Sequence, residues 1–88
     1  MPMKSQFELS VIEKVKLKRE SHNISQKQLA YLMDLSVGFI GRVESPKFPA
    51  KWNLDHINKL AEIFDCSPKD FLPDKFIKER KRNKGISK

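Results

Sequence analysis

Cysteine and glycine are scarce in this chain of 88 residues, which contains one cysteine and three glycines. The single cysteine, Cys66, excludes an intramolecular disulfide and a zinc site built from several cysteines. His22 and His56 have no cysteine or carboxylate pair at metal-ligand spacing, so we expect no metal site. This cysteine usage fits a reducing compartment, and we expect the protein to be cytoplasmic.

Long hydrophobic runs are absent as well. No apolar stretch approaches the about 20 residues that a helix needs to cross a bilayer. The first residues, MPMKSQFELS, contain no apolar signal-peptide core. We therefore expect neither membrane insertion nor export.

Few residues are available for a core, because 39% of the chain is apolar and it has one Trp and one Tyr. A chain this short has room for one domain and a tail, and a deep substrate cleft is unexpected. The sequence contains no catalytic triad and no glycine-rich loop. We predict a binding protein that is not an enzyme and needs no cofactor.

Positive charge is concentrated at the C-terminal end of a chain whose net charge is +7. Residues 75–88 hold seven basic side chains and one acidic side chain, so residues 1–74 are nearly neutral. Such a run indicates a polyanionic partner, although a lysine-rich tail can also simply keep a small protein soluble. We predict a folded domain over residues 1–73 and a basic tail over residues 74–88 that is either disordered or a helix that forms on a partner.

Apolar residues recur at intervals of three and four, which is typical of amphipathic helices, and no alternating pattern indicates a strand. The predicted helices lie near residues 8–21, 25–33, 36–44, 54–65 and 68–72. Four of the starts are marked by cap residues: Ser25, Ser36, Asn53 and Ser67. The first helix has two candidate capping boxes, Ser5 with Glu8 and Ser10 with Glu13, and its start therefore stays open.

A very short turn joins the second and third predicted helices. Only Asp34 and Leu35 separate them, and a turn this tight needs a left-handed residue, which aspartate tolerates better than most. Two short helices joined by such a turn form a helix-turn-helix. In this motif the second helix enters the major groove of DNA while the first crosses the backbone.

The order of these elements resembles the phage-repressor and Cro-like helix-turn-helix family, also called XRE-like, over about residues 8–72. The matching residues are Ser25, Gln26, Leu29 and Ala30 in the second helix, and Ser36, Ile40, Arg42, Val43 and Glu44 in the third. The segment LAEIFDCSPKDFL resembles the family's last two helices. The resemblance implies an all-α, five-helix, lambda-repressor-like domain that regulates transcription by binding specific double-stranded DNA sequences.

The resemblance also implies which residues meet the DNA. Base edges would be met by Val37, Gly38, Gly41 and Arg42. Phosphates would be met by Ser25, Gln26, Lys27, Ser36, Lys47 and Lys51. Arg42 is the strongest candidate for direct readout, because a guanidinium can pair with guanine O6 and N7. Arg19 and Glu44 match family positions that form a structural ion pair between the first and third helices.

The sequence departs from the family pattern at the ends of two helices. Asp34 replaces the usual turn glycine, and Ser45-Pro46 replaces a frequent polar–glycine pair, so the third helix must end differently. Because Arg42 is the one side chain of that helix suited to bidentate base contacts, we expect specificity to rest on few contacts or on DNA shape.

Two kinds of partner follow from this interpretation. Family members commonly bind as homodimers to paired half-sites, and we expect a homodimer on DNA. An alternative is an antitoxin-like or other interaction module whose tail, residues 74–88, binds a partner protein through Phe76, Ile77 and Ile86. An RNA or single-strand binder is a weaker alternative, because the basic run lacks interleaved aromatic platforms.

Overall fold

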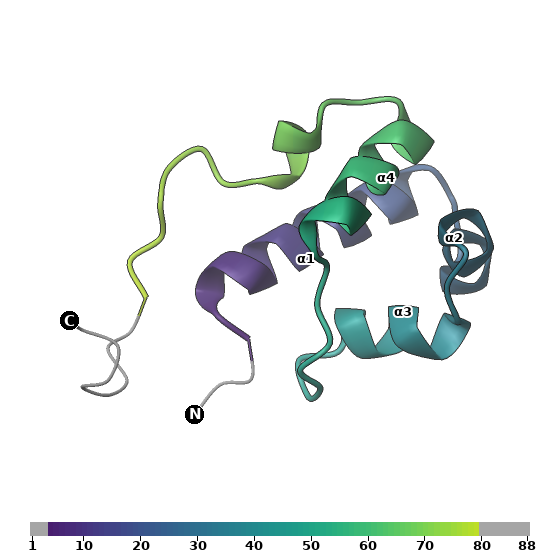
Figure 1. The fold of residues 1–88 in the computed structure, drawn as a ribbon, viewed down its shortest axis with the longest axis horizontal. Coiled ribbons are helices and arrows are strands. Elements are labelled where there is room, and N and C mark those ends of the chain that lie inside the picture. Colours follow the sequence, from purple (N-terminus) through teal and green to yellow (C-terminus); the bar gives the residue numbers. More distant parts are fainter. Residues whose placement is uncertain (1–3, 80–88) are drawn as a thin grey trace.

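The computed structural model describes residues 4–79. Within this range the chain forms α1 (Gln6–Ser21), α2 (Gln26–Met33), α3 (Val37–Glu44), α4 (Leu54–Phe64) and the 3₁₀ turn η1 (Pro68–Phe71). Figure 1 shows α2 at one end of the molecule with the start of α3 beside it, and both α1 and α4 pack against η1. The predicted all-α class is confirmed.

The fifth predicted helix is one short 3₁₀ turn instead of an α-helix. Ser67 caps it and Pro68 occupies its first position, as the sequence indicates. Pro73 follows directly after Leu72, and a residue before proline is pushed away from helical backbone angles. The segment therefore has no room for a second turn.

The first helix starts at the earlier of its two candidate capping boxes. The Glu8 N–H donates to Ser5 Oγ over 3.0 Å, and the Ser5 N–H donates to Glu8 Oε1 over 2.9 Å. Ser10 lies inside the helix. The start near residue 8 that apolar periodicity predicts is two residues late, because the first turn of α1 lies mostly outside the core.

Three of the four α-helices of residues 4–79 end at a left-handed residue. These residues are Asn23, Asp34 and Asp65, with φ of 56°, 60° and 53°. In each case the next residue closes the helix by donating its N–H to a carbonyl five residues earlier: Ile24 to Arg19, Leu35 to Ala30 and Cys66 to Ala61. The predicted left-handed turn at Asp34 is confirmed. It leaves α2 and α3 packed directly on each other.

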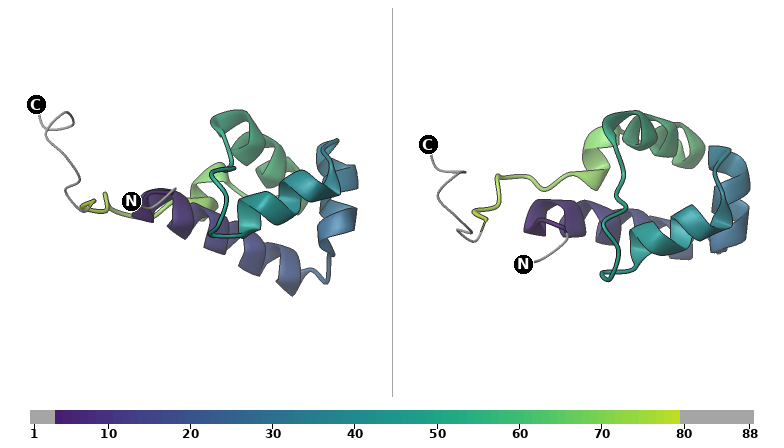
Figure 2. Two further views of the ribbon diagram at one scale, coloured as in Figure 1. Left: turned by 90° about the horizontal axis from the view of Figure 1, so that it is seen from below. Right: turned by 60° about the horizontal axis from the view of Figure 1, so that its bottom comes forward.

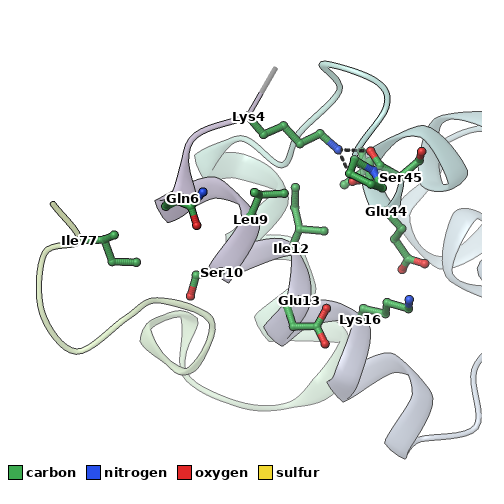
Figure 3. A pocket seen from close by; sticks show the side chains of 12 residues that line it. Lys4, Gln6, Leu9, Ser10, Ile12, Glu13, Lys16, Glu44, Ser45 and Ile77 are labelled. Atoms are coloured by element: carbon green, nitrogen blue, oxygen red, sulfur yellow. Dashed lines mark hydrogen bonds between the residues drawn. The ribbon is translucent and has the colours of Figure 1, made fainter. Parts of the chain in front are cut away.

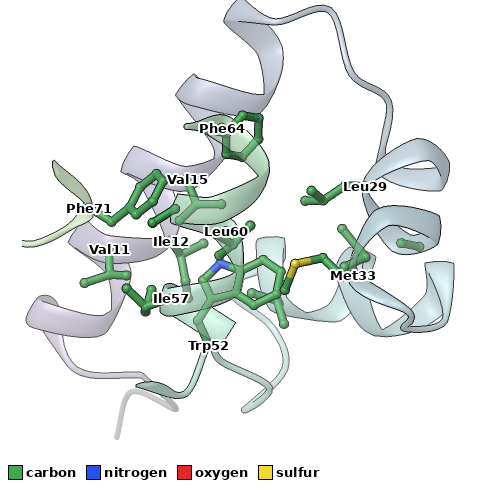
Figure 4. Packing of buried hydrophobic residues seen from close by; sticks show 14 residues of the cluster. Val11, Ile12, Val15, Leu29, Met33, Trp52, Ile57, Leu60, Phe64 and Phe71 are labelled. Carbon is green, nitrogen blue, oxygen red and sulfur yellow. The ribbon is translucent and has the colours of Figure 1, made fainter. Parts of the chain in front are cut away.

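One hydrophobic core joins all of these elements (Figure 4). Its most enclosed side chains are Val15, Leu29, Ile40, Val43, Leu60 and Phe71. Trp52 is also buried, and its ring meets Phe39 and His56 edge-on, which attaches the loop before α4 to α3. Ile40 and Val43 fix which side of α3 faces inward.

Two further views show the same division of the molecule (Figure 2). The helix pair α2 and α3 lies at one end, and the start of α1 lies near residues 74–79 at the other. In the described part of the chain, no helix combines the length and the apolar composition needed to cross a membrane.

Candidate nucleic-acid interface

One side of α3 is available to a ligand. Ile40 and Val43 are buried, whereas Val37 is 50% exposed and Gly38 and Arg42 are exposed. Gly41 is half-buried beside Gln26, since a Cβ at Gly41 would lie 3.8 Å from Gln26 Oε1. The helical period places the four predicted base-contact residues on one face, but Gly41 sits deeper than the others.

The N-termini of α2 and α3 carry predicted phosphate contacts. Ser25 Oγ accepts the Gln28 N–H and Ser36 Oγ accepts the Phe39 N–H, each over 3.0 Å, and both serines are exposed. Helix N-termini favour anions, because their first N–H groups and the helix dipole present positive charge. Lys27, in the first turn of α2, and Lys47, in the loop after α3, are both exposed.

Two other predicted phosphate contacts are engaged within the protein. Gln26 Nε2 donates to Glu44 Oε1 over 2.9 Å, and Lys51 Nζ lies 2.8 Å from Glu8 Oε2. An amide nitrogen has two hydrogens, so Gln26 retains one for another acceptor. The Lys51 side chain is half exposed, and its ion pair would have to open before Lys51 contacts a phosphate.

Arg19 and Glu44 form a bidentate ion pair that joins α1 to the end of α3. Arg19 Nε lies 2.9 Å from Glu44 Oε2, and Arg19 Nη2 lies 3.0 Å from Glu44 Oε1. Arg19 Nη1 donates to the Ile24 carbonyl over 2.7 Å. The two side chains are only 10% and 4% exposed, so their desolvation is offset by these hydrogen bonds and by the one from Gln26.

A family model described as a Cro/C1-type helix-turn-helix DNA-binding domain matches residues 16–76. The chain belongs to this family. The crystal structure of the restriction-modification controller protein C.AhdI from Aeromonas hydrophila is similar, with a TM-score of 0.63 and 26% sequence identity. The match covers 73% of this chain and 94% of C.AhdI. Comparison with curated proteins gave no match.

Lys4, which precedes the residues that the family model matches, is a functional candidate that the sequence did not reveal. It is 3% exposed, and its ammonium donates to the carbonyls of Val43, Ser45 and Arg42 over 2.6, 2.7 and 3.3 Å. Figure 3 shows the Lys4 side chain reaching Ser45 at the end of α3. Burial lowers the pKa of Lys4 and the positive charge of Lys51 lowers it further, while the Glu8 carboxylate opposes this shift. The atypical Ser45-Pro46 pair signalled an unusual helix end, but nothing in the sequence identified Lys4 as its partner.

The first part of the expected tail is attached to the Cro/C1-type domain. The Glu79 carboxylate accepts the N–H groups of Gln6 and Phe7 over 2.9 and 3.0 Å. Half-buried Ile77 lines a groove of about 560 Å³ with Leu9 and other residues of α1 and of the end of α3 (Figure 3). Within the expected tail, Ile77 and Glu79 thus contact α1 and the groove beside it. Residues 80–88, including Ile86, lie outside the described residues.

Burial shifts the pKa of two further titratable side chains, His56 and Cys66. Over residues 4–79, no three His, Cys, Asp or Glu side chains gather in a metal-binding arrangement. His56 Nδ1 accepts the Asn53 N–H over 3.0 Å in the capping box of α4, and burial lowers the pKa of His56. Burial also raises the pKa of the Cys66 thiol, as do the carboxylates of Asp70 and Asp65.

Proposed function

We propose that this protein is a sequence-specific double-stranded DNA-binding regulator of transcription, and that α3 enters the major groove. The observation that carries the proposal is the exposed face of α3, which presents Arg42 and Val37 beside two glycines. The family membership supports DNA as the ligand. C.AhdI is described as a controller protein, and its likeness supports a regulatory role.

Each part of this face has a distinct task in the proposed complex. Arg42 pairs with guanine O6 and N7, and the methyl groups of Val37 contact a thymine methyl. Gly38 and Gly41 let the helix backbone approach the base edges closely. With one bidentate side chain, the remaining discrimination comes from DNA shape.

Phosphate contacts surround this face. The capped N-termini of α2 and α3, at Ser25 and Ser36, receive phosphates through their first N–H groups. Lys27 and Lys47 add charge, and Gln26 donates its second amide hydrogen. Lys51 contacts a further phosphate once its ion pair with Glu8 has opened.

We further propose that the protein acts in the cytoplasm as a homodimer on two half-sites about one helical turn apart. Leu54, at the start of α4, is 83% exposed beside an apolar groove lined by Phe7, Val11, Ile57 and Leu72. A second copy that covers this region would remove apolar surface from water, which supports a dimer contact on the α4 and η1 side.

Selection of bound duplexes from a random pool, followed by salt titration, tests this proposal. We expect enrichment of a palindromic motif and an affinity that falls steeply with salt. Arg42→Ala should relax the preference at one base position in each half-site, and weaken binding by about ten-fold. Lys59→Ala is the matched charge control, because Lys59 is exposed on α4 and lines neither the predicted DNA face nor the apolar groove at Leu54. A pool that enriches no motif would overturn sequence-specific recognition.

A second candidate function is binding of a partner protein through residues 74–88, as in an antitoxin-like module. The observation that favours it is Phe76, which is 82% exposed next to the basic run. Capture of one defined protein by the full chain, lost on Phe76→Ser while duplex binding stays absent at low salt, would support this candidate over the first.

A further inference from the structure

The recognition helix α3 ends without the closure that its neighbours have. Ser45 follows it in extended conformation, with φ −96° and ψ 132°, and only the Ser45 N–H returns to the helix, to the Arg42 carbonyl over 3.3 Å. By the pattern of the other three α-helices, residue 46 would donate to the carbonyl five residues earlier. Residue 46 is Pro46, which has no N–H. The last carbonyls of α3 therefore need a donor from elsewhere.

The Lys4 ammonium, from just before α1, supplies a donor to two of these carbonyls, those of Arg42 and Val43, and to the Ser45 carbonyl just beyond the helix. A lysine at the negative end of a helix is favourable for both hydrogen bonding and the helix dipole. Because a buried ammonium is costly unless its hydrogens are all used, these three acceptors account for the 3% exposure of Lys4.

This closure matters more for α3 than for an ordinary helix. Two of its eight residues, Gly38 and Gly41, are glycines, and each lowers intrinsic helix stability by about 1 kcal/mol relative to alanine. At the same end, Glu44 is held by Arg19 and Gln26 through its side chain. Lys4 holds the backbone of the same turn, in which Arg42 also lies.

We propose that Lys4 is a positioning residue for DNA recognition: it fixes the last turn of α3 and thereby the direction in which Arg42 leaves the helix. This inference rests on the proposed function. Lys4 itself does not touch DNA, because its ammonium is buried against protein carbonyls. Its partners are carbonyls of the protein, whereas the proposed partners of the exposed lysines are DNA phosphates.

Amide hydrogen exchange of the full chain without DNA tests the structural half of the inference. Lys4→Met keeps the aliphatic stem and removes the donor. We expect exchange at the Glu44 and Ser45 amides to rise by about ten-fold, while protection in the middle of α4 is unchanged. Lys14→Met is the matched control and should leave α3 unchanged. A uniform loss of protection in all helices would overturn the positioning role in favour of a general stabilising role.

Binding to the duplex selected by the unsubstituted protein tests the functional half. Lys4→Met should lower affinity for this duplex by about ten-fold, equivalent to weakening one base contact. The slope of log affinity against log salt should stay unchanged, whereas loss of a phosphate contact reduces it by about one. An unchanged affinity, or a reduced slope, would overturn the inference. If the unsubstituted chain selects no duplex, the proposed function fails, and the DNA half of the inference fails with it. The hydrogen-exchange result still shows whether Lys4 stabilises the last turn of α3.

A replacement closure provides an independent check, also in case Lys4→Met alone does not fold. Ser45→Gly with Pro46→Ala provides a left-handed residue and an N–H at residue 46, so that α3 can close on the Gly41 carbonyl as the neighbouring helices close on theirs, without Lys4. In this background we expect Lys4→Met to have at most a two- to three-fold effect on affinity, on the scale of a hydrogen bond of modest net strength. An undiminished effect would show that Lys4 does something other than close α3, and would overturn the inference.

Discussion

The carboxylate of Glu44 receives the guanidinium of Arg19 through two hydrogen bonds of 2.9 and 3.0 Å, across the contact between α1 and α3. The same carboxylate accepts Gln26 at the start of α2, so one side chain joins three helices. Any change in this pair should therefore affect the angle of the whole helix-turn-helix.

Removal of one partner of this ion pair should lower the free energy of unfolding more than removal of both partners. Arg19→Met leaves a buried carboxylate without its charge partner, and we expect the free energy of unfolding to fall by about 3 kcal/mol. Arg19→Met with Glu44→Leu should recover at least half of that loss. Urea unfolding followed by circular dichroism measures both values. Lys59→Ala, which removes the exposed ion pair with Glu62, is the control and should cost about 0.5 kcal/mol or less. Additive losses in the double variant would contradict this interpretation.

Gly38→Ala should separate stability from DNA recognition. Alanine favours the helix by up to about 1 kcal/mol, so the free energy of unfolding should rise. However, the new Cβ would lie 3.3 Å from Arg42 Nη1, and the guanidinium would have to shift by a few tenths of an ångström. Duplex binding should then show weaker base discrimination despite higher stability. Gly41→Ala, whose Cβ would lie 3.8 Å from Gln26 Oε1, is the comparison variant for stability. If Gly38→Ala raises stability and leaves base discrimination unchanged, the position of the Arg42 guanidinium does not determine base discrimination.

The capping box of α4 should make stability depend on pH. His56 Nδ1 accepts the Asn53 N–H only when it is unprotonated, and burial lowers the pKa of His56 below its ordinary 6.5. As pH falls below about 6.5, the unfolded chain binds a proton before the folded one does, so stability is lost until the lowered pKa is passed.

This dependence can be measured by urea unfolding between pH 8 and pH 5. His56→Gln should reduce it, because glutamine keeps an acceptor in the box, as Gln28 does in α2, and does not titrate. His22→Gln leaves the Asn53 box intact and is the matched control. If His56→Gln and the unsubstituted protein lose stability equally over this range, the dependence comes from other groups.

The thiol of Cys66 should react slowly in the folded protein. Burial and the nearby carboxylates of Asp65 and Asp70 raise its pKa, so little thiolate is present near neutral pH. We expect alkylation by iodoacetamide at pH 7.5 to be at least about ten-fold slower in buffer than in guanidinium chloride, on the basis of thiolate fraction and access. Mass spectrometry at timed intervals measures both rates. Equal rates would mean that the α4–η1 connection opens readily.

Local chemistry made part of this structure predictable. The starts of α2, α3 and α4 follow from Ser25, Ser36 and Asn53, and the tight turn follows from the tolerance of Asp34 for left-handed angles. The start of α1 was ambiguous because two equivalent capping boxes stand five residues apart. Periodicity placed the start near residue 8, between the starts that the two boxes would give, since few residues of the first turn are buried.

Long-range contacts were beyond prediction from one sequence. Lys4 bonds to a carbonyl 39 residues away, and Glu79 bonds to an N–H 72 residues away, without any local pattern at either partner. The same limit applies within the candidate site. Gln26 and Lys51 were predicted from the sequence to contact DNA phosphates. In the structure Gln26 bonds to Glu44 and Lys51 to Glu8, and these bonds depend on how the helices pack against one another.

The position of Glu79 on the first turn of α1 has a practical consequence for handling the protein. Lys4 directly precedes the first turn of α1 and Glu79 bonds to that turn, next to the groove that reaches Ser45. A dye attached at Glu79 would therefore stand beside this groove and remove the hydrogen bonds to Gln6 and Phe7. A label at Glu62, exposed on α4, sits on a helix that carries none of the predicted DNA contacts.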